Sequence, residues 1–470
     1  MALIAALLLA LAPAAPAGAE PTPAPGAGVF ALVHALDEAG TKGLWPGFDP
    51  AALPLAVFDG ERTYLFRHPA PPAGFSPVPG RPGVLSAPGR HPGVVTNSTR
   101  EIGGVRTATV VATPSQSLED VLLAVVEEVF HVFWLARHPS IRPDEMARYV
   151  YPLADAENLR GLLGEDEALA RAIEAGGDEE AAGWAALALA IRGDRVRRLA
   201  DEVRAWETAL EAMEGTANAV ARRAAGQGPE ETAARLRQGR SAEAVRWRFY
   251  DTGAALSFLL DRLEPGWKVR SDAEPARDLV SFLAPALARR GARPAAFAPG
   301  DEERIRERAS ADVEALASRR LRLREEVLSR PGARLVLEAA EGAAPFRLER
   351  FDAVNLLVLD GGEVVHASSL TLSAEGGRVE VRNPAFSRGS FAGTVALTAP
   401  AGRHPLRDGI RRLTVPGLAG PPRVGRANGT LTVEAPGLVL ELRDAGVVTE
   451  GETTCVVVPA PGATGRSPGP

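Results

Sequence analysis

The clearest fold signal in the sequence is one apolar run, Val121-Leu122-Leu123-Ala124-Val125-Val126-Glu127-Glu128-Val129-Phe130-His131-Val132-Phe133-Trp134. Ser117 precedes it at the position of a helix N-cap, with Glu119 and Asp120 in the first turn. His138-Pro139 follows it, and a proline disfavours helical backbone in the residue before it. The sequence therefore predicts one long helix that begins near residue 118 and ends near 137.

Three ionisable side chains interrupt this apolar run. Glu127 and His131 are four residues apart, so they lie on the same face of the helix, at the spacing that two metal ligands require. Glu128 is rotated from Glu127 by about 100° around the helix axis. In that position a general base could act on a water molecule activated by the metal. The run therefore predicts a metal site with Glu127 and His131 as ligands.

A metal site needs a third protein ligand, and a second predicted helix offers carboxylates. Glu207, Glu211 and Glu214 are spaced so that they line one face of a helix. A stripe of this kind is also typical of a solvated helix surface, so two interpretations stay open. Small residues after Glu214, such as Gly215 and Ala217, allow another helix to approach closely. They favour the functional interpretation, in which one of these carboxylates is the third ligand, and Glu211 is the alternative to Glu214 if the helix register favours it.

The pair of motifs Glu128-x-x-His131 and Glu214-Gly215-Thr216-Ala217 resembles the gluzincin metallopeptidases. Members of that family carry His-Glu-x-x-His on one helix and a glutamate, the third zinc ligand, on a later helix. The resemblance implies that His131 and Glu214 bind zinc and that Glu128 is the general base. It places Glu127 where the family has its first histidine. The interval between His131 and Glu214 is longer than in compact members, which implies additional helices between them.

Other segments resemble exported bacterial proteins of this architecture, over residues 29–270 and more weakly beyond. They are Leu44-Trp45-Pro46-Gly47-Phe48-Asp49-Pro50, Phe58-Asp59-Gly60, Thr63-Tyr64-Leu65-Phe66, Tyr250-Asp251-Thr252-Gly253-Ala254-Ala255 and Leu260-Asp261-Arg262-Leu263-Glu264-Pro265-Gly266-Trp267-Lys268. Tyr250 is the first residue of the segment that ends at Ala255. In gluzincins a tyrosine or histidine often stabilises the oxyanion, and the resemblance implies this role for Tyr250. A tyrosine in the hydrophobic core is the alternative.

Glu127 decides which function the motif supports. A Glu/His/Glu ligand set is harder and more anionic than His/His/Glu, so it makes an activated water less acidic and a weaker nucleophile. Without a cation the carboxylates repel one another, and one of them is expected to be protonated. Three interpretations follow: a zinc metallopeptidase of altered activity, a catalytically inactive pseudopeptidase that is an extracellular or envelope binding protein, and an acidic helix without a metal.

The chain begins with an apolar run, residues 2–11, followed by the small residues Ala17-Gly18-Ala19. This pattern predicts a signal peptide over residues 1–19, although it lacks a basic n-region because the first basic residue is Lys42. We therefore expect an exported protein, periplasmic or extracellular, with no membrane span in the mature chain. The segments 20–28 and 460–470 are rich in proline, glycine and alanine and are predicted to be a disordered linker and a disordered tail.

The rest of the sequence predicts an α+β protein in three parts. Residues 29–115 are expected to be a β-containing region, with a hairpin of 53–58 and 63–66 around Asp59-Gly60. Residues 116–330 are predicted to be a helical, metallopeptidase-like domain. Period-two patterns between glycine and proline turns predict a β-sandwich over 331–459. The expected helices are 118–137, 143–148, 155–175, 179–225 with a break near Gly193, 229–238, 241–264, 274–290 and 301–329.

Composition narrows the function further. The 470 residues carry a net charge of -6, and the arginines are mixed with acids, which indicates no nucleic-acid partner. A peptide or protein, as substrate or ligand, is the expected partner. The single cysteine, Cys455, excludes an internal disulfide and is expected in a buried strand. His68, His138, His366 and His404 have no partner at ligand spacing and are expected to be structural or exposed. The sequence contains no Gly-x-Ser-x-Gly, Walker or dinucleotide-binding motif.

Overall fold

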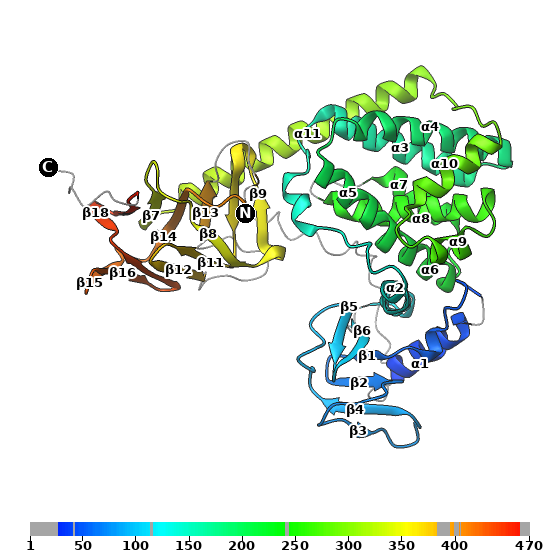
Figure 1. Cartoon of the computed structure of the whole chain (residues 1–470), viewed down its shortest axis with the longest axis horizontal. Coiled ribbons are helices and arrows are strands. Elements are labelled where there is room, and N and C mark those ends of the chain that lie inside the picture. The colour runs from blue at the N-terminus through cyan, green and yellow to red at the C-terminus, as the bar shows by residue number, and fades with distance from the viewer. Residues whose placement is uncertain are drawn as a thin grey trace, which may run out of the picture. The chain divides into compact units, whose positions relative to one another are not determined.

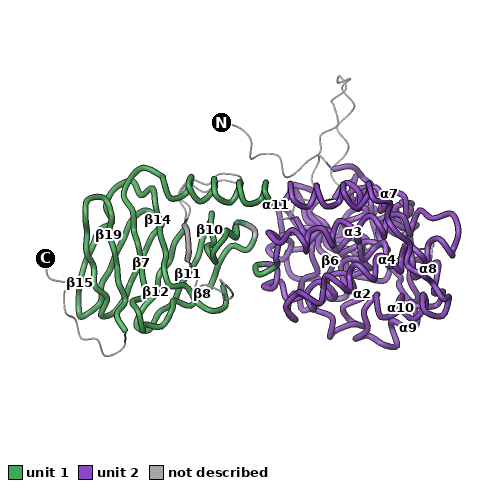
Figure 2. Tube along the Cα trace, turned by 90° about the horizontal axis from the view of Figure 1, so that it is seen from above, with its two compact units in different colours: residues 1–16, 149–151, 314–470 green, residues 17–148, 152–313 purple. Residues whose placement is uncertain are grey.

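The computed structural model describes residues 27–40, 43–112, 116–239, 244–382, 395–398, 404 and 406–460. The predicted signal peptide, residues 20–26 of the predicted linker and residues 461–470 of the predicted tail lie outside these ranges. The chain divides into two compact units (Figure 2). The helical unit contains residues 17–148 and 152–313, and the strand unit contains residues 149–151 and 314–470. The division falls inside the long helix α11 (Pro299–Leu328).

The helical unit opens with α1 (Ala27–Gly40), where the sequence was expected to form strands and turns. This prediction was wrong, and the linker predicted over 20–28 overlaps the first turn of α1. Val29, Leu32 and Leu36 are buried at intervals of three and four residues, which is the period of a helix face. Burial of this stripe against the core explains why the segment is helical.

A six-stranded sheet follows in the order β3-β4-β2-β1-β6-β5, so that β5 lies at an edge. The predicted hairpin is confirmed: β1 and β2 pair antiparallel, and Asp59 Oδ1 accepts hydrogen bonds from the backbone amides of Glu61 and Arg62 at 2.9 and 2.8 Å. Gly60 has a φ of 103°, a conformation that side chains disfavour. The strands are β1 (Leu55–Phe58), β2 (Arg62–Phe66), β3 (Ser76–Pro77), β4 (Val84–Pro88), β5 (Ser98–Ile102) and β6 (Val105–Val111).

Helices make up the rest of this unit (Figure 1). The predicted break near Gly193 is displaced: α4 continues through that residue, and the chain leaves the helix only after Val196. The helix α9 was not predicted. The elements are α2 (Leu118–Arg137), a 3-10 turn (Glu145–Val150), α3 (Ala156–Glu174), α4 (Asp178–Val196), α5 (Asp201–Leu210), a π turn (Glu211–Gly215), α6 (Thr216–Ala225), α7 (Pro229–Gln238), α8 (Val245–Leu263), α9 (Trp267–Ala273) and α10 (Leu279–Arg289).

The helix α2 has the predicted bounds and contacts both the sheet, through β5 and β6, and the helix α6 (Figure 1). The Ser117 hydroxyl accepts the Asp120 amide at 3.1 Å, as an N-cap should. Phe130 and Trp134 are at most 1 % exposed and both pack against Trp45. These ring contacts fix the rotation of α2, and therefore the direction in which its polar face points.

The strand unit contains two sheets, which form two layers in Figure 1. Their orders are β18-β19-β7-β14-β13-β10-β9 and β15-β16-β17-β12-β11-β8. Buried and exposed residues alternate along β17, so one face of this strand is covered and the other is exposed. The strands are β7 (Ala333–Ala339), β8 (Arg347–Phe351), β9 (Leu356–Val358), β10 (Glu363–His366), β11 (Ser369–Ala374), β12 (Gly377–Arg382), β13 (Val395–Thr398), β14 (Arg412–Leu418), β15 (Arg423–Ala427), β16 (Thr430–Ala435), β17 (Leu438–Arg443), β18 (Gly446–Glu450) and β19 (Thr453–Val458).

The α+β class is therefore confirmed, with strands at both ends of a helical region. The sequence predicts strands at 334–338, 346–349, 355–359, 378–381, 393–397, 429–433 and 438–442, and each of them overlaps an observed strand. The strands β10, β11, β14, β15 and β18 were not predicted. Cys455 lies in β19 as expected, but it is half-buried rather than buried. Among the described helices, none combines the length and the apolar character needed to cross a membrane.

Candidate metal centre

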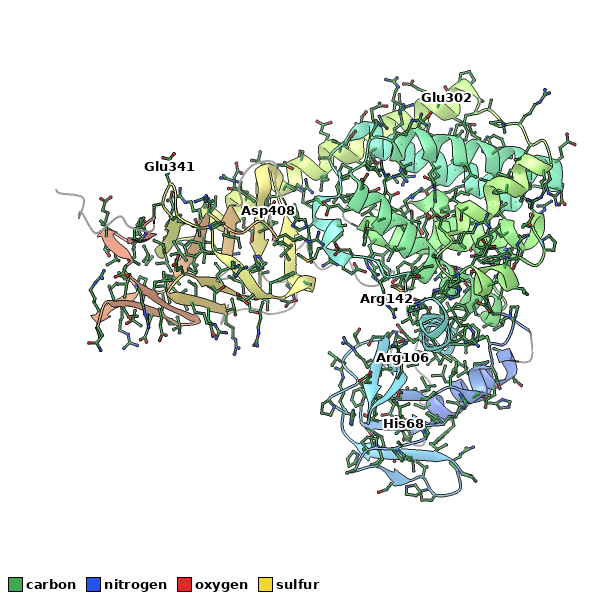
Figure 3. The ribbon with its side chains drawn as sticks, in the orientation of Figure 1. His68, Arg106, Arg142, Glu302, Glu341 and Asp408 are labelled. Atoms are coloured by element: carbon green, nitrogen blue, oxygen red, sulfur yellow. The ribbon has the colours of Figure 1, made fainter. Side chains whose placement is uncertain are left out.

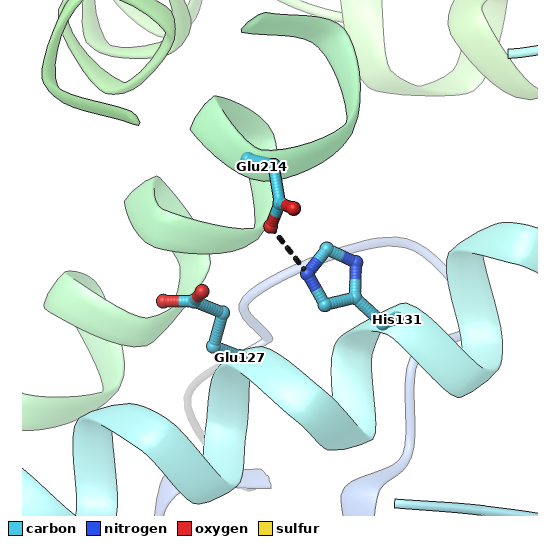
Figure 4. Close-up of side chains that lie close together, drawn as sticks. All are labelled: Glu127, His131 and Glu214. Carbon is cyan, nitrogen blue, oxygen red and sulfur yellow. Dashed lines mark hydrogen bonds and ion pairs between the residues drawn. The ribbon is translucent and has the colours of Figure 1, made fainter. Parts of the chain in front are cut away.

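Three side chains from two helices meet in the helical unit (Figure 4). Glu127 and His131 project from α2, and Glu214 projects from the π turn above it. One ligand atom from each residue lies within 4.8 Å of the other two. His131 Nε2 is 3.0 Å from Glu214 Oε2, and both residues are buried. The structure thus brings together the three residues that were predicted to be ligands.

The π turn determines which glutamate reaches the histidine. Glu207, Glu211 and Glu214 were expected on one helix face, but each contacts a different partner. Glu207 accepts from Arg195 at 2.7 and 2.8 Å, and Glu211 accepts from Arg192 at 2.6 Å. A π turn holds more residues than an α turn and is frequent at functional sites, and this one directs Glu214 to His131.

Two predictions about this stripe of glutamates are therefore corrected. The solvated-surface interpretation is wrong, because Glu207, Glu211 and Glu214 are only 5, 3 and 7 % exposed. The alternative ligand, Glu211, does not belong to the group of possible ligands, and its carboxylate accepts hydrogen bonds from Arg192 and from the hydroxyl of Thr252. These guanidinium and hydroxyl donors offset the free-energy cost of burying the Glu211 carboxylate.

A contact between two glycines holds the π turn against α8. A Cβ atom built on Gly215 would lie 2.4 Å from the Cα of Gly253. A Cβ atom on Gly253 would lie 2.5 Å from the carbonyl oxygen of Glu211. Only glycine allows the two backbones to approach this closely. The contact sets the distance between Glu214 and the side chains that α8 presents.

Two of those side chains bind Glu214. Arg246 Nη2 donates to Glu214 Oε1 at 2.9 Å, and Arg246 Nη1 donates to the hydroxyl of Tyr250 at 2.6 Å. The Tyr250 hydroxyl also hydrogen bonds with Glu214. Tyr250 is both buried and directed at the site, so the two interpretations of this residue are compatible. Arg246 was not predicted, and its position one turn before Tyr250 was the available signal.

The electrostatics of the centre follow from three carboxylates around one imidazole. Burial, together with the Glu214 carboxylate, raises the pKa of Glu127 to about 8. Burial alone would lower the pKa of His131, but Glu214 outweighs it and raises that pKa to about 9. Burial opposes ionisation of Glu214 too, yet His131 and Arg246 lower its pKa to about 2. Without a cation, Glu214 is therefore an anion, His131 a cation and Glu127 protonated near neutral pH, as expected for crowded carboxylates.

Glu128 has a pKa suited to accepting a proton. It is half-buried on α2, and burial raises its pKa to about 7, while His131 opposes the rise and Glu214 adds to it. A general base works best when its pKa is near the working pH. Strand β5 lies beside it, because Thr99 Oγ1 donates to the backbone carbonyl of Glu128 at 3.5 Å.

The donor set and its size fit a zinc ion. Histidine nitrogen and carboxylate oxygen are both zinc ligands, and two ligands at about 2.0–2.2 Å from one zinc are at most about 4.4 Å apart. The observed spread of up to 4.8 Å needs only small rotations of the glutamate side chains. His131 would bind through Nε2, the atom that now contacts Glu214. A divalent cation would also remove the repulsion that keeps Glu127 protonated.

The other histidines lie away from this centre. His68 (Figure 3) donates through Nε2 to the carbonyl of Ile102 at 2.9 Å. His138 stacks on Trp134 and hydrogen bonds with the carbonyl of Ser271 at 3.2 Å. His366 is buried in β10 of the strand unit. These positions agree with the structural roles expected from the sequence.

No protein-family model matches the chain, and no curated protein or solved structure is significantly similar to it.

Proposed function

We propose that this chain is an exported zinc metallopeptidase-like protein that hydrolyses peptide bonds. The observation that carries the proposal is the convergence of Glu127, His131 and Glu214 from two helices, with Glu128 adjacent. The resemblance to gluzincins supports the same assignment. Glu127, in place of a histidine, makes the ligand set more anionic, and the Arg246 guanidinium beside Glu214 offsets part of that charge.

A zinc ion held by these residues would supply Lewis-acid activation of a water molecule and of the substrate carbonyl. Glu128 takes a proton from the attacking water, whose oxygen forms a bond to the carbonyl carbon. The C–N bond then breaks, and Glu128 returns the proton to the leaving nitrogen. We assign to Tyr250 and Arg246, which hydrogen bond to each other and to Glu214, the role of donating hydrogen bonds to the oxygen that becomes negative.

A peptide is the substrate class that fits the surroundings of Glu128. Strand β5 ends the sheet, so it has no neighbouring strand on one side among the described residues. An extended peptide can pair with such an edge through backbone hydrogen bonds. The contact of Thr99 on β5 with the Glu128 carbonyl would bring a peptide bound there close to the general base.

One observation favours the second candidate, an inactive pseudopeptidase that binds a partner outside the cell or in its envelope. The ion pair of His131 with Glu214, extended by Arg246, satisfies these charges without a cation. A centre that is stable in this form could persist after the loss of turnover. The pseudopeptidase predicts that no peptide is hydrolysed, whether or not the chain binds metal, and this outcome distinguishes it from the peptidase.

The test is a screen of the zinc-loaded chain against a library of quenched-fluorescent peptides. Glu128→Gln should lower hydrolysis by about 100- to 10,000-fold, the usual contribution of a general base. Glu119→Gln is the matched control, because Glu119 is exposed in the first turn of the same helix and should leave the rate unchanged. Hydrolysis that survives Glu128→Gln would come from a contaminant or another site. An absence of hydrolysis with zinc bound would favour the pseudopeptidase.

A further inference from the structure

Asn218 on α6 hydrogen bonds with the carboxylate of Glu127. This hydrogen bond lowers the pKa of Glu127 and therefore stabilises its ionised form, which can only accept, so the Asn218 side-chain nitrogen is the donor. Arg222 supports this orientation independently, because its Nε donates to Asn218 Oδ1 at 2.7 Å. The oxygen of the amide is thereby directed to Arg222 and its NH2 group to Glu127.

Arg222 is itself held in place. It is 3 % exposed, and its two terminal nitrogens donate to Gln227 Oε1 at 2.9 Å and to Asp251 Oδ1 at 3.3 Å. The helix α6 packs closely on α2, and small residues of α6 such as Ala217 and Ala221 are buried. The Asn218 amide therefore cannot rotate freely, and it reaches Glu127 from a fixed direction.

We propose that Asn218 is a positioning residue matched to a glutamate ligand, and that it makes Glu127 usable at this position. The inference rests on the proposed metal centre. A hydrogen bond to one carboxylate oxygen leaves the other oxygen free for the metal and limits rotation of the side chain. Hydrogen bonds of this kind orient metal ligands and commonly contribute about 10- to 100-fold in affinity.

The chemistry of the pair predicts a reversal when the ligand is changed. A histidine at position 127 that binds metal through one nitrogen carries N–H on the other and needs an acceptor. Asn218 presents its NH2 group to that position. This donor would face the N–H donor of the histidine, so no hydrogen bond could form. In a Glu127→His variant, the substitution Asn218→Asp would supply the missing acceptor. In the original chain, the same substitution would place a second negative charge beside Glu127 and remove the proton that Asn218 donates to it.

The experiment measures zinc Kd, by competition with a chromophoric chelator, for the full chain and for Asn218→Asp, Glu127→His and the double variant. Asn218→Asp should weaken binding by about tenfold or more in the original chain and tighten it by about tenfold or more in Glu127→His. Gln227→Glu is the matched control, since it also adds a charge beside Arg222 but does not contact Glu127. It should change Kd by similar factors in both backgrounds.

A general loss of folding cannot produce opposite signs, and the melting temperature of each zinc-free variant checks folding separately. If wild type and Glu127→His both bind zinc but Asn218→Asp acts in the same direction in each, Asn218 does not position the ligand and the inference fails alone. If the original chain binds no zinc, the proposed metal centre and this inference fail together.

Discussion

His131 Nε2 lies 3.0 Å from Glu214 Oε2, although 83 residues separate the two in the chain. The π turn before α6 and the ring contacts of α2 bring these side chains together from independent elements. The same ion pair balances the charge of the centre when no cation is bound. Its removal should therefore affect the metal-free protein as well as metal binding.

In the metal-free chain, Glu214→Gln should reduce the free energy of unfolding of the helical unit by about 3 kcal/mol, because it leaves the buried, protonated His131 without its ion-pair partner and removes one of the two carboxylates that pair with Arg246. Urea denaturation with a chelator present measures this change. All six tryptophans lie within residues 45–267, so their fluorescence reports on the helical unit. Glu303→Gln, which breaks an exposed pair with Arg306, should produce no measurable change. Equal effects of the two variants would contradict the structural role of the ion pair.

Zinc affinity should rise with pH and become constant above about pH 9, the pKa of His131 in the metal-free chain. Binding requires neutral His131 and ionised Glu127, and their raised pKa values of about 9 and about 8 keep both protonated at neutral pH. Each displaced proton contributes up to about a tenfold change in affinity per pH unit. Chelator competition between pH 6 and 9 tests this dependence. An affinity that does not change with pH would show that zinc binds elsewhere.

Gly253→Ala should destabilise the helical unit by about 1–3 kcal/mol, because the new Cβ would lie 2.5 Å from the Glu211 carbonyl oxygen. It should also lower zinc affinity by displacing the π turn that carries Glu214. Gly193→Ala is the control with the opposite expected sign. At that position in α4 the nearest atom is 3.9 Å away, and alanine in a helix is more stable than glycine by about 0.5–1 kcal/mol. Denaturation curves for both variants provide the comparison.

The part of the centre on α2 could be predicted because it depends on local features. The Ser117 cap, the apolar run and Pro139 gave the bounds of the helix, and the interval of four residues put Glu127 and His131 on one face. The choice of Glu214 over Glu211 could not be derived from helical spacing. It depends on a π turn and on the pairing of Arg195 with Glu207 and of Arg192 with Glu211, which are tertiary effects.

Elsewhere the sequence was less informative about long-range pairing. The helix α1 was missed although Val29, Leu32 and Leu36 have helical spacing, because the short apolar run around them also suits a strand. Individual strands such as β7 and β17 follow from alternation. Their order in two sheets depends on partners distant in the chain, such as the parallel pairing of β19 with β7. Asn218 contributes a hydrogen bond that no spacing rule reveals, and the sequence signalled Arg246 only by its position one turn before Tyr250.

The strand unit should lose stability in acid through His366. Burial lowers the pKa of this histidine to about 3, and neither ring nitrogen has a hydrogen-bond partner among the described residues. The unfolded chain takes up a proton below its ordinary pKa of 6.5. The folded chain does not, so stability falls as the pH decreases from there towards 3, by about 1.4 kcal/mol per pH unit. The protection factors of residues 363–374 in hydrogen exchange, which correct for the slower intrinsic exchange in acid, should therefore fall as the pH decreases, and His366→Leu should reduce this fall.

The central claim is that Glu127, His131 and Glu214 hold a metal ion. It is tested most directly by the metal content of the purified chain after zinc loading and desalting, measured by mass spectrometry. We predict about one zinc per chain, which His131→Ala abolishes and His34→Ala, a change of an exposed histidine on α1, retains. A chain that keeps no zinc, or that keeps it equally in both variants, would contradict the account.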